Sequence, residues 1–530
     1  MSTAVAGTAP LLRASMEHDG RRMAPWIVIV TALSASSVLV YPLIFPEQQE
    51  RAALATAIGA NPALGLIFGP AFDLSTTDGF NAWRSLALGG FLAALGAIFA
   101  VTRATRAQED SGQAELLASG VLGRAGRLLA GVGLAMIGSV MLGVVCGVVT
   151  ALCGGDWGSS LLLAATFTAM GWMFAAVAAV TAQLGSDSRT ANSMAVGTLG
   201  ALFLLRGFAY SVDAPAWTVW INPLGWMTET RPANGDRWWP LWYALALSLV
   251  LIGVAFALQA RRDFGQGIIA PRPGPSRGRA RTTWRLVLRL NRGPVITWAV
   301  AFVALGVVFG FFATSITDIL GENSAVAHVL AAGATTPDAL VSAFLVTILS
   351  LVGIIASIPG VQIMLRLRTE ELEDRVEPVV ATKVRRRRYF AGNVVLALAA
   401  PAVYVLIAGM LIATLAATAD IGVEFGDALV QAAATVPAVW TVVAVSVAVV
   451  GARPVVSLVA WLGVLVSFVL TLLGPTFKLW DWVLAISPYW HIPNVTAADA
   501  DWLGLVWISL VTALFVAIGF AGFRRRDLAR

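Results

Sequence analysis

Long apolar runs separated by short polar segments dominate the chain. A membrane-spanning helix needs about 20 consecutive apolar residues, and twelve such runs occur, each without Asp, Glu or Lys through its middle. They cover approximately residues 26–45, 83–102, 128–153, 159–184, 191–210, 238–260, 295–317, 339–365, 390–418, 428–450, 454–474 and 502–523. The pattern predicts an all-α integral membrane protein with twelve transmembrane helices.

Composition agrees with lipid as the main solvent, because 58% of the 530 residues are hydrophobic and only 12% are charged. The net charge of +6 could indicate nucleic-acid binding. Membrane proteins, however, collect Arg on their cytoplasmic loops, and that collection explains the basic balance. We therefore expect membrane lipid as a partner and no nucleic acid.

Charges on alternate loops predict the orientation. Arginines gather in the N-terminal segment, in the loop between the second and third runs, and in the linker near residue 270, whereas segments 318–338 and 419–427 carry acids and no Arg or Lys. Because basic residues resist translocation, both termini are predicted in the cytoplasm of a multi-pass plasma-membrane protein. The outer loops are then 46–82, 211–237, 318–338 and 475–501.

The chain divides into two similar halves. A Pro-, Gly- and Arg-rich linker lies at its midpoint, and the sequence after the sixth run, "ARRDFG", returns as "RRRDLA" after the twelfth, 264 residues later. Amphipathic stretches at 11–26 and 284–298 precede the first run of each half and predict helices on the membrane surface. The predicted domains are a first six-span half (1–265), a cytoplasmic linker with a connecting helix (266–293), and a second six-span half (294–530).

One charged block is also duplicated. Residues 368–388 hold five acidic and seven basic side chains, and residues 106–124 occupy the same place in the first half, which pairs Arg106 with Arg368 and Glu109 with Glu371. A loop that only fixes orientation needs positive charge alone, yet both copies keep acids at matched spacing. The pattern favours a duplicated functional element, with a simple orientation signal as the alternative.

Several kinds of chemistry lack their residues. A phosphate-binding loop ends in Gly-Lys-Ser/Thr, but the only lysines, Lys383 and Lys478, are followed by Val and Leu. The three histidines, His18, His328 and His491, are scattered, so no metal site is predicted. We therefore expect that this chain is not itself an enzyme and that it binds no cofactor.

The first charged block resembles the loop between the second and third spans in permease subunits of type-2 ABC exporters. The stretch "EDSGQAELLASGVLGR" follows the family pattern at Glu109, Asp110, Gly112, Glu115, Leu116, Leu117 and Arg124. The second block departs from it, because Asp374 replaces the Gly and Pro378 follows Glu377. The chain as a whole is similar to the fused twelve-span permeases of actinobacterial tetronasin-type antibiotic and multidrug exporters.

This resemblance implies an ATP-driven exporter of hydrophobic or amphipathic compounds. One permease chain would work with two copies of a separate ATPase subunit, which would bind ATP and Mg. The charged blocks would be coupling helices that dock into those subunits, and the second copy would use Glu371, Glu373, Glu377, Val379 and Arg386.

The resemblance also implies that the second and fifth spans of each half line the substrate cavity. The candidate cavity residues are Phe91, Phe99, Phe203, Arg206, Phe344, Trp461 and Phe468. Packing against neighbouring helices or lipid is the alternative for the aromatic residues, and snorkelling to the interface is the alternative for Arg206. An ion-coupled twelve-span transporter is the alternative function, although such carriers usually place acids inside the membrane.

Overall fold

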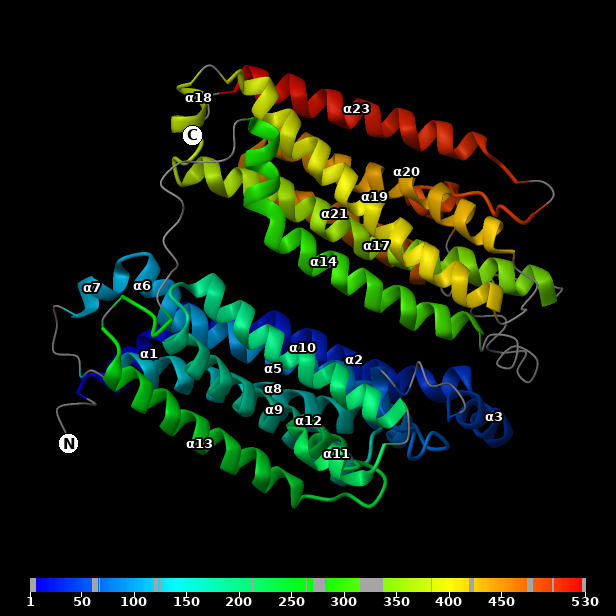
Figure 1. Cartoon of the computed structure of the whole chain (residues 1–530). Helices are drawn as coiled ribbons and strands as arrows, with labels where there is room; N and C mark the ends of the chain where they lie inside the picture. The colour runs from blue at the N-terminus through cyan, green and yellow to red at the C-terminus, as the bar shows by residue number, and fades with distance from the viewer. Residues whose placement is uncertain are drawn as a thin grey trace. The chain divides into compact units, whose positions relative to one another are not determined.

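The computed structural model describes residues 6–59, 65, 67–118, 123, 125–211, 214–263, 265–269, 282–314, 337–382, 384–418, 424–473, 480–497 and 500–526. Over these residues the regular structure is helical, without strands, and twelve helices are long and apolar enough to cross a membrane. The prediction of an all-α protein with twelve spans is confirmed (Figure 1).

The chain forms two compact units, Met1–Gly274 and Pro275–Arg530. In the first unit a surface helix, α1 (Thr8–Asp19), precedes the first span, and α3 (Gln48–Gly59) follows it. Short helices α11 (Ala216–Ile221) and α12 (Pro223–Thr228) precede the sixth span. The six spans are α2 (Ala24–Ile44), α5 (Thr77–Thr102), α8 (Gly126–Leu152), α9 (Trp157–Leu184), α10 (Ser188–Ser211) and α13 (Pro240–Arg261).

The second unit repeats this order with less regular helices. Its fifth span, residues 454–473, is a 3₁₀ turn, a short helix α21 (Leu462–Phe468) and a π turn in succession, whereas its counterpart α10 is one α-helix. The other spans are α14 (Thr283–Thr314), α17 (Pro337–Leu372), α19 (Arg386–Thr418), α20 (Phe425–Ala452) and α23 (Leu503–Arg525).

Internal prolines are a second difference between the units, because a proline inside a helix removes a backbone hydrogen bond and bends the helix. Among the described spans of the first unit only α2 contains an internal proline, Pro42. Four spans of the second unit contain one, namely Pro294, Pro359, Pro401 and Pro437.

The amphipathic stretch before the seventh span differs from our prediction of a connecting helix within the linker. Residues 283–293 are the first part of α14 itself, which continues through Pro294 and is visibly bent (Figure 1). A proline near the start of a long helix can kink it without ending it. In the first unit, by contrast, a 3₁₀ turn at Gly20–Met23 separates α1 from α2.

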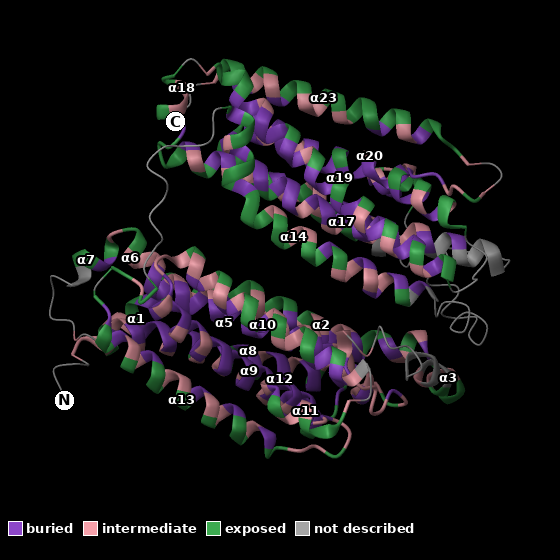
Figure 2. Cartoon of the chain, viewed as in Figure 1, coloured by how far each residue is buried: buried purple, intermediate pink, exposed green. Residues whose placement is uncertain are grey.

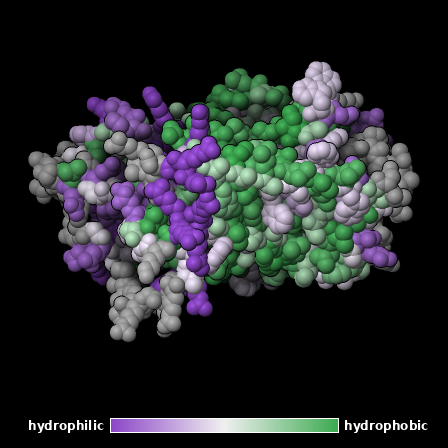
Figure 3. Space-filling model, turned by 90° about the horizontal axis from the view of Figure 1, so that it is seen from above, coloured by the Kyte–Doolittle hydropathy of each residue, from purple (hydrophilic) through white to green (hydrophobic). Residues whose placement is uncertain are grey.

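The second and fourth spans form the centre of each unit. Their most apolar windows are 72% buried in α5, α9 and α17 and 67% buried in α20, whereas the sixth spans α13 and α23 reach only 17% (Figure 2). Small residues allow this packing, as where Gly143 and Gly147 of α8 lie against Ala164 of α9. The helices at the edge therefore depend on lipid. Figure 3 shows a broad hydrophobic region on one face, with hydrophilic residues densest at one end of it and fewer at the other.

Candidate functional site

The first charged block continues directly from the second span. After α5 the chain makes a π-helical turn at Arg103–Ala107 and then forms α6 (Gln108–Asp110) and α7 (Gln113–Ala118). Arg106 and Glu109 are three positions apart and therefore share one face of this helical segment. A helix that continues beyond the span thus carries both side chains past its end.

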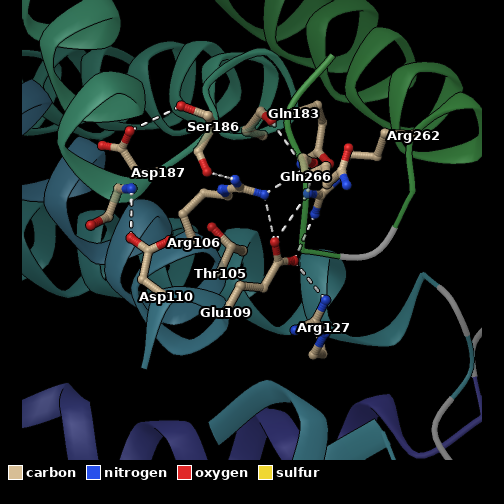
Figure 4. Close-up of polar contacts among 12 residues, drawn as sticks. Thr105, Arg106, Glu109, Asp110, Arg127, Gln183, Ser186, Asp187, Arg262 and Gln266 are labelled. Atoms are coloured by element: carbon tan, nitrogen blue, oxygen red, sulfur yellow. Dashed lines mark hydrogen bonds and ion pairs between the residues drawn. The ribbon is translucent and has the colours of Figure 1, made fainter. Parts of the chain in front are cut away.

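The Glu109 carboxylate contacts three arginines (Figure 4). Arg106 Nη1 lies 2.6 Å from Oε2, and Arg127 Nη2 lies 2.7 Å from Oε1. Arg262 donates to both oxygens, at 2.7 and 3.0 Å. The Glu109 side chain is 2% exposed. We call Glu109 and these arginines the Glu109 clasp, and it joins the charged loop to the end of the sixth span.

The arginines of this clasp also bind main-chain carbonyls just beyond two spans. Arg106 Nη2 donates to the Ser186 carbonyl after α9, and Arg262 Nη1 donates to the Gln266 carbonyl at 2.8 Å. The oxygen of a main-chain carbonyl carries partial negative charge, so these two carbonyls satisfy guanidinium N–H groups that Glu109 does not bind. The clasp therefore holds three chain segments together.

The chain after α13 is also strapped to the end of α9. The backbone N–H groups of Ile268 and Ile269 each donate at 3.0 Å, to the carbonyls of Gln183 and Leu184. Gly267 is required for this approach, because a Cβ there would come within 2.2 Å of the Gly185 carbonyl oxygen. The start of the linker is thus part of the same assembly.

Two aspartates extend the contacts to the fifth span. Asp110 Oδ2 accepts a hydrogen bond from the backbone N–H of Ser188, the first residue of α10, at 2.7 Å. Asp187 accepts from the backbone and hydroxyl of Thr190, both at 2.9 Å. Burial acts to raise the pKa of Asp187, but hydrogen bonds led by those from Thr190 outweigh it and bring the pKa below its ordinary value. Both carboxylates suit the positive N-terminus of α10.

Beyond the clasp, the loop turns outward at Gly112, which has a left-handed φ of 76°. The following helix α7 exposes Glu115, and the Leu116 side chain is 77% exposed. The Leu117 side chain and Arg124, which the sequence also assigned to docking, lie outside the described residues. Among the described residues of the first block, α7 thus exposes Glu115 and Leu116, and Asp110 and Ser111 just before it are exposed as well.

The second block forms a corresponding clasp around Glu371, whose side chain is 0% exposed. Arg526 Nη2 lies 2.7 and 2.8 Å from its two oxygens, and Arg368 Nη1 lies 3.3 Å from Oε2. Arg526 Nε also donates to the carbonyl of Gly451 in the last turn of α20, at 3.0 Å. This Glu371 clasp again joins the charged loop, the fourth span of the half and the end of the sixth.

The exposed part of the second block is arranged differently. Asp374 adopts the left-handed conformation of Gly112, with φ 55°. The helix α18 (Glu377–Val380) exposes Glu377, but Val379 is half-buried and packs against the core. Glu373 and Arg386 are also exposed.

The structure changes the interpretation of several predicted docking residues. We expected Glu109 and Glu371 to offer charges to a partner, but both are buried in intramolecular ion clusters. Val379, expected to make an apolar contact with the partner, is instead turned toward the core. Glu115, Leu116, Glu373 and Glu377 remain accessible. The docking assignment itself stays a prediction.

The predicted cavity residues separate into groups. Phe91 of α5 meets Phe203 of α10 edge to face at 5.1 Å, and Phe99 lies 6.0 Å from Trp26. Trp461 is half-buried and Phe468 is exposed on the irregular eleventh span, while the side chain of Phe344 lies outside the described residues. A shared cavity stays a prediction.

Arg206 neither snorkels nor faces an open space. It is buried, and its guanidinium donates to the Ile67 carbonyl at 2.7 Å and to Thr228 Oγ1 at 3.3 Å. It also lies over the Phe203 ring at 4.8 Å. Because its partners come from the segment between α3 and α5 and from α12, Arg206 fastens that segment to α10.

An apolar groove of about 580 Å³ lies within the first unit, between α8, α9 and α13. Its lining includes Val144, Trp172 and Trp242, and it contains none of the predicted cavity residues. Because the groove lies on membrane-spanning helices, we expect lipid chains to fill it.

Sequence reasoning missed the arginine partners. Arg127, Arg262 and Arg526 were treated as orientation or repeat markers, and Arg84, inside the second span, was not considered, although it donates to Ser37 Oγ at 3.1 Å. A signal existed for two of them, because Arg262 and Arg526 belong to the repeated "RRD" sequence. That repeat could have suggested partners for the repeated glutamates.

Comparison with known proteins gives two matches. A sequence model described as the C-terminal domain of the multidrug efflux system permease Rv1217c matches residues 51–258 and 281–524. The multidrug efflux system permease protein Rv1217c of Mycobacterium tuberculosis is 34% identical over 531 aligned residues, which cover 98% of this chain and 95% of the relative. Both matches extend over both halves.

Proposed function

The chain belongs to the multidrug efflux permease family, and we propose that it is the membrane subunit of an ATP-driven exporter of hydrophobic or amphipathic compounds. In this proposal two copies of a separate ABC ATPase bind ATP and Mg and dock on the two charged loops. The loops and both termini then lie in the cytoplasm. The efflux permease relative supports a transport role, and the loops support the coupling to an ATPase.

The observation that carries the proposal is the pair of clasps. Each half holds an exposed short helix, α7 or α18, at the end of a long span, and each loop is fixed by a buried carboxylate and at least two arginines. A loop that must receive force from a motor needs such an anchor, because movement is passed on only through elements that keep their arrangement.

The docking surface then consists of accessible side chains only. In the first half it is Glu115 with Leu116, and in the second it is Glu373 with Glu377 and the exposed Leu372. Each surface combines at least one acid with a leucine, which suits a partner cleft that offers basic and apolar groups. Glu109 and Glu371 are not part of these surfaces, but they anchor the loops that carry them.

Ion coupling, the alternative function, has weaker support. Proton- or sodium-driven carriers keep ionisable residues at membrane depth. Within the described parts of the twelve spans, acidic residues lie in the first or last turns of their helices, as Asp78 and Glu371 do. Glu371 is moreover held by arginines.

Co-purification with the ATPase tests the proposal. The chain is co-expressed with the ATP-binding-cassette subunit encoded nearest to its gene, and Glu115→Lys with Glu377→Lys is compared with wild type. Reversing both exposed charges should weaken ATPase association about tenfold or more, because like charges then oppose the partner. The matched control is Glu47→Lys with Glu424→Lys, two exposed acids at the opposite ends of their units.

The control pair should bind the ATPase as wild type does. If wild type retains no ATPase, or if the docking variant retains it fully and keeps drug-stimulated ATP hydrolysis, the proposed function is wrong.

A further inference from the structure

We propose that the two clasps are the coupling joints of the transporter, with Glu109 and Glu371 as positioning residues that make the charged loop, the end of the fourth span and the end of the sixth span move as one body. This inference rests on the proposed function, because it concerns how movement of a docked ATPase reaches the spans. It assigns a role in coupling to side chains that do not touch the partner.

The first support is that both halves build the same junction from different details. In each half a buried glutamate on the extension of the second span binds an arginine that follows the sixth span, at 2.7 Å in both cases. In each half an arginine of the clasp also binds a carbonyl at or just beyond the C-terminus of the fourth span. The glutamate and arginine that meet are 153 residues apart in the first half and 155 apart in the second. Because both halves contain this contact, we infer that it has the same role in each.

The second support is burial. The two carboxylates are 2% and 0% exposed, so water cannot replace an arginine that moves away. A buried charge left without its partner is strongly unfavourable, and the segments joined by it therefore resist separation. Exposed ion pairs on the same loops, such as Arg375 with Glu373, lack this property.

The third support is the set of spans that each clasp reaches. In the first half the loop is bound to the Ser186 carbonyl after α9 through Arg106 and to the start of α10 through Asp110. A displacement of α7 is thereby carried to the turn between the fourth and fifth spans. In the second half Arg526 joins the loop to α20 and α23.

A clasp that served only to stabilise the fold would have the same geometry, so the test must measure coupling. The complete transporter with its ATPase carries Glu109→Gln and Glu371→Gln, singly and together. The readout is the ratio of substrate-stimulated to basal ATP hydrolysis per bound ATPase, in which the amount of folded protein cancels.

We expect ATPase association to persist while this ratio falls by about fivefold or more in the double variant, as for the loss of a typical coupling free energy. The conservative variant Glu109→Asp, which keeps a carboxylate among the three arginines, should recover part of the ratio that Glu109→Gln loses. The matched control is Glu229→Gln, which also removes a buried carboxylate paired with two arginines, but in the segment after α12.

The ratio should stay at the wild-type value in Glu229→Gln. An unchanged ratio in the clasp variants, or an equal fall in Glu229→Gln, overturns the inference while ATPase association by wild type keeps the proposed function intact. Loss of that association in wild type would instead refute the proposed function.

A second measurement uses the wild-type complex and so does not depend on variants that fold. Hydrogen exchange is followed with and without ATP at the ATPase. Segments 108–118, 183–188 and 266–269 should change protection together, because the clasp joins them. A change confined to 108–118 would overturn the inference.

Discussion

The two clasps differ in which arginines bind the carboxylate and which arginine binds the carbonyl at the fourth span. Glu109 is surrounded by three arginines, and Arg106 of its own helix reaches the carbonyl after the fourth span. Glu371 has two, and the distant Arg526 both binds the carboxylate and reaches the fourth span. Both halves therefore join the charged loop to the ends of the fourth and sixth spans, but a different arginine donates to the carbonyl at the fourth span.

The exposed sides of the two loops differ as well. The first presents a separate helix, α7, with the exposed Leu116, whereas the second turns Val379 inward and presents Leu372 from the end of α17. Two identical ATPases would thus meet unequal surfaces.

The largest contrast is expected when the sixth-span arginine is removed. Arg526→Gln leaves the buried Glu371 with Arg368 at 3.3 Å, and we expect it to destabilise the second unit by about 3–5 kcal/mol, the usual cost of breaking a buried pair. Arg262→Gln leaves Glu109 with Arg106 and Arg127 at 2.6 and 2.7 Å, so about 1–2 kcal/mol is expected.

Thermal unfolding of the purified variants in detergent measures this order, and Arg524→Gln, an exposed neighbour of Arg526, is the control. If the two variants lose the same stability, the additional arginine of the Glu109 clasp does not compensate for the loss of Arg262.

The sequence predicts the spans and the repeat well, because both depend on local periodicity or direct similarity. The predicted run 159–184 matches α9 at Trp157–Leu184, and the run 390–418 lies inside α19. The sequence repeat pairs Glu109 with Glu371, and the structure places each of them in a clasp. Their burial was not predicted, because it depends on how the helix extension faces segments more than 150 residues away.

Arg206 shows a related limit. Its position in an apolar run suggested a cavity residue, or a side chain that snorkels to the interface, but the fold brings the Ile67 carbonyl and Thr228 to it from two other segments. Because tertiary packing brings these partners to Arg206, the sequence around Arg206 does not indicate them.

A second contrast concerns the packing of the sixth spans. In α23, a Cβ on Gly519 would come within 2.6 Å of the Val447 carbonyl oxygen, whereas a Cβ on Gly253 of α13 meets nothing within 4 Å. Gly519→Ala should therefore destabilise the protein by about 1–3 kcal/mol through overpacking. Gly253→Ala should stabilise it by up to about 1 kcal/mol, because alanine favours the helix.

The two variants should shift the melting temperature in opposite directions in the same detergent. A tolerated Gly519→Ala would mean that α23 can move away from α20 at little cost.

The smallest contrast lies in the left-handed turn that follows each clasp. Gly112 and Asp374 have φ of 76° and 55°, a region that glycine adopts freely and that aspartate tolerates better than most residues. Gly112→Ala should cost about 1 kcal/mol, and Gly112→Asp, which copies the second half, should cost less. Asp374→Gly should change stability by no more than about 0.5 kcal/mol, because relief of strain is offset by the greater freedom of the unfolded chain. Hydrogen exchange of residues 113–118 and 377–380 reports these changes locally. If Gly112→Ala and Gly112→Asp destabilise the protein equally, aspartate has no advantage in this turn. The difference between the two loops must then be explained by the surface that the second loop exposes.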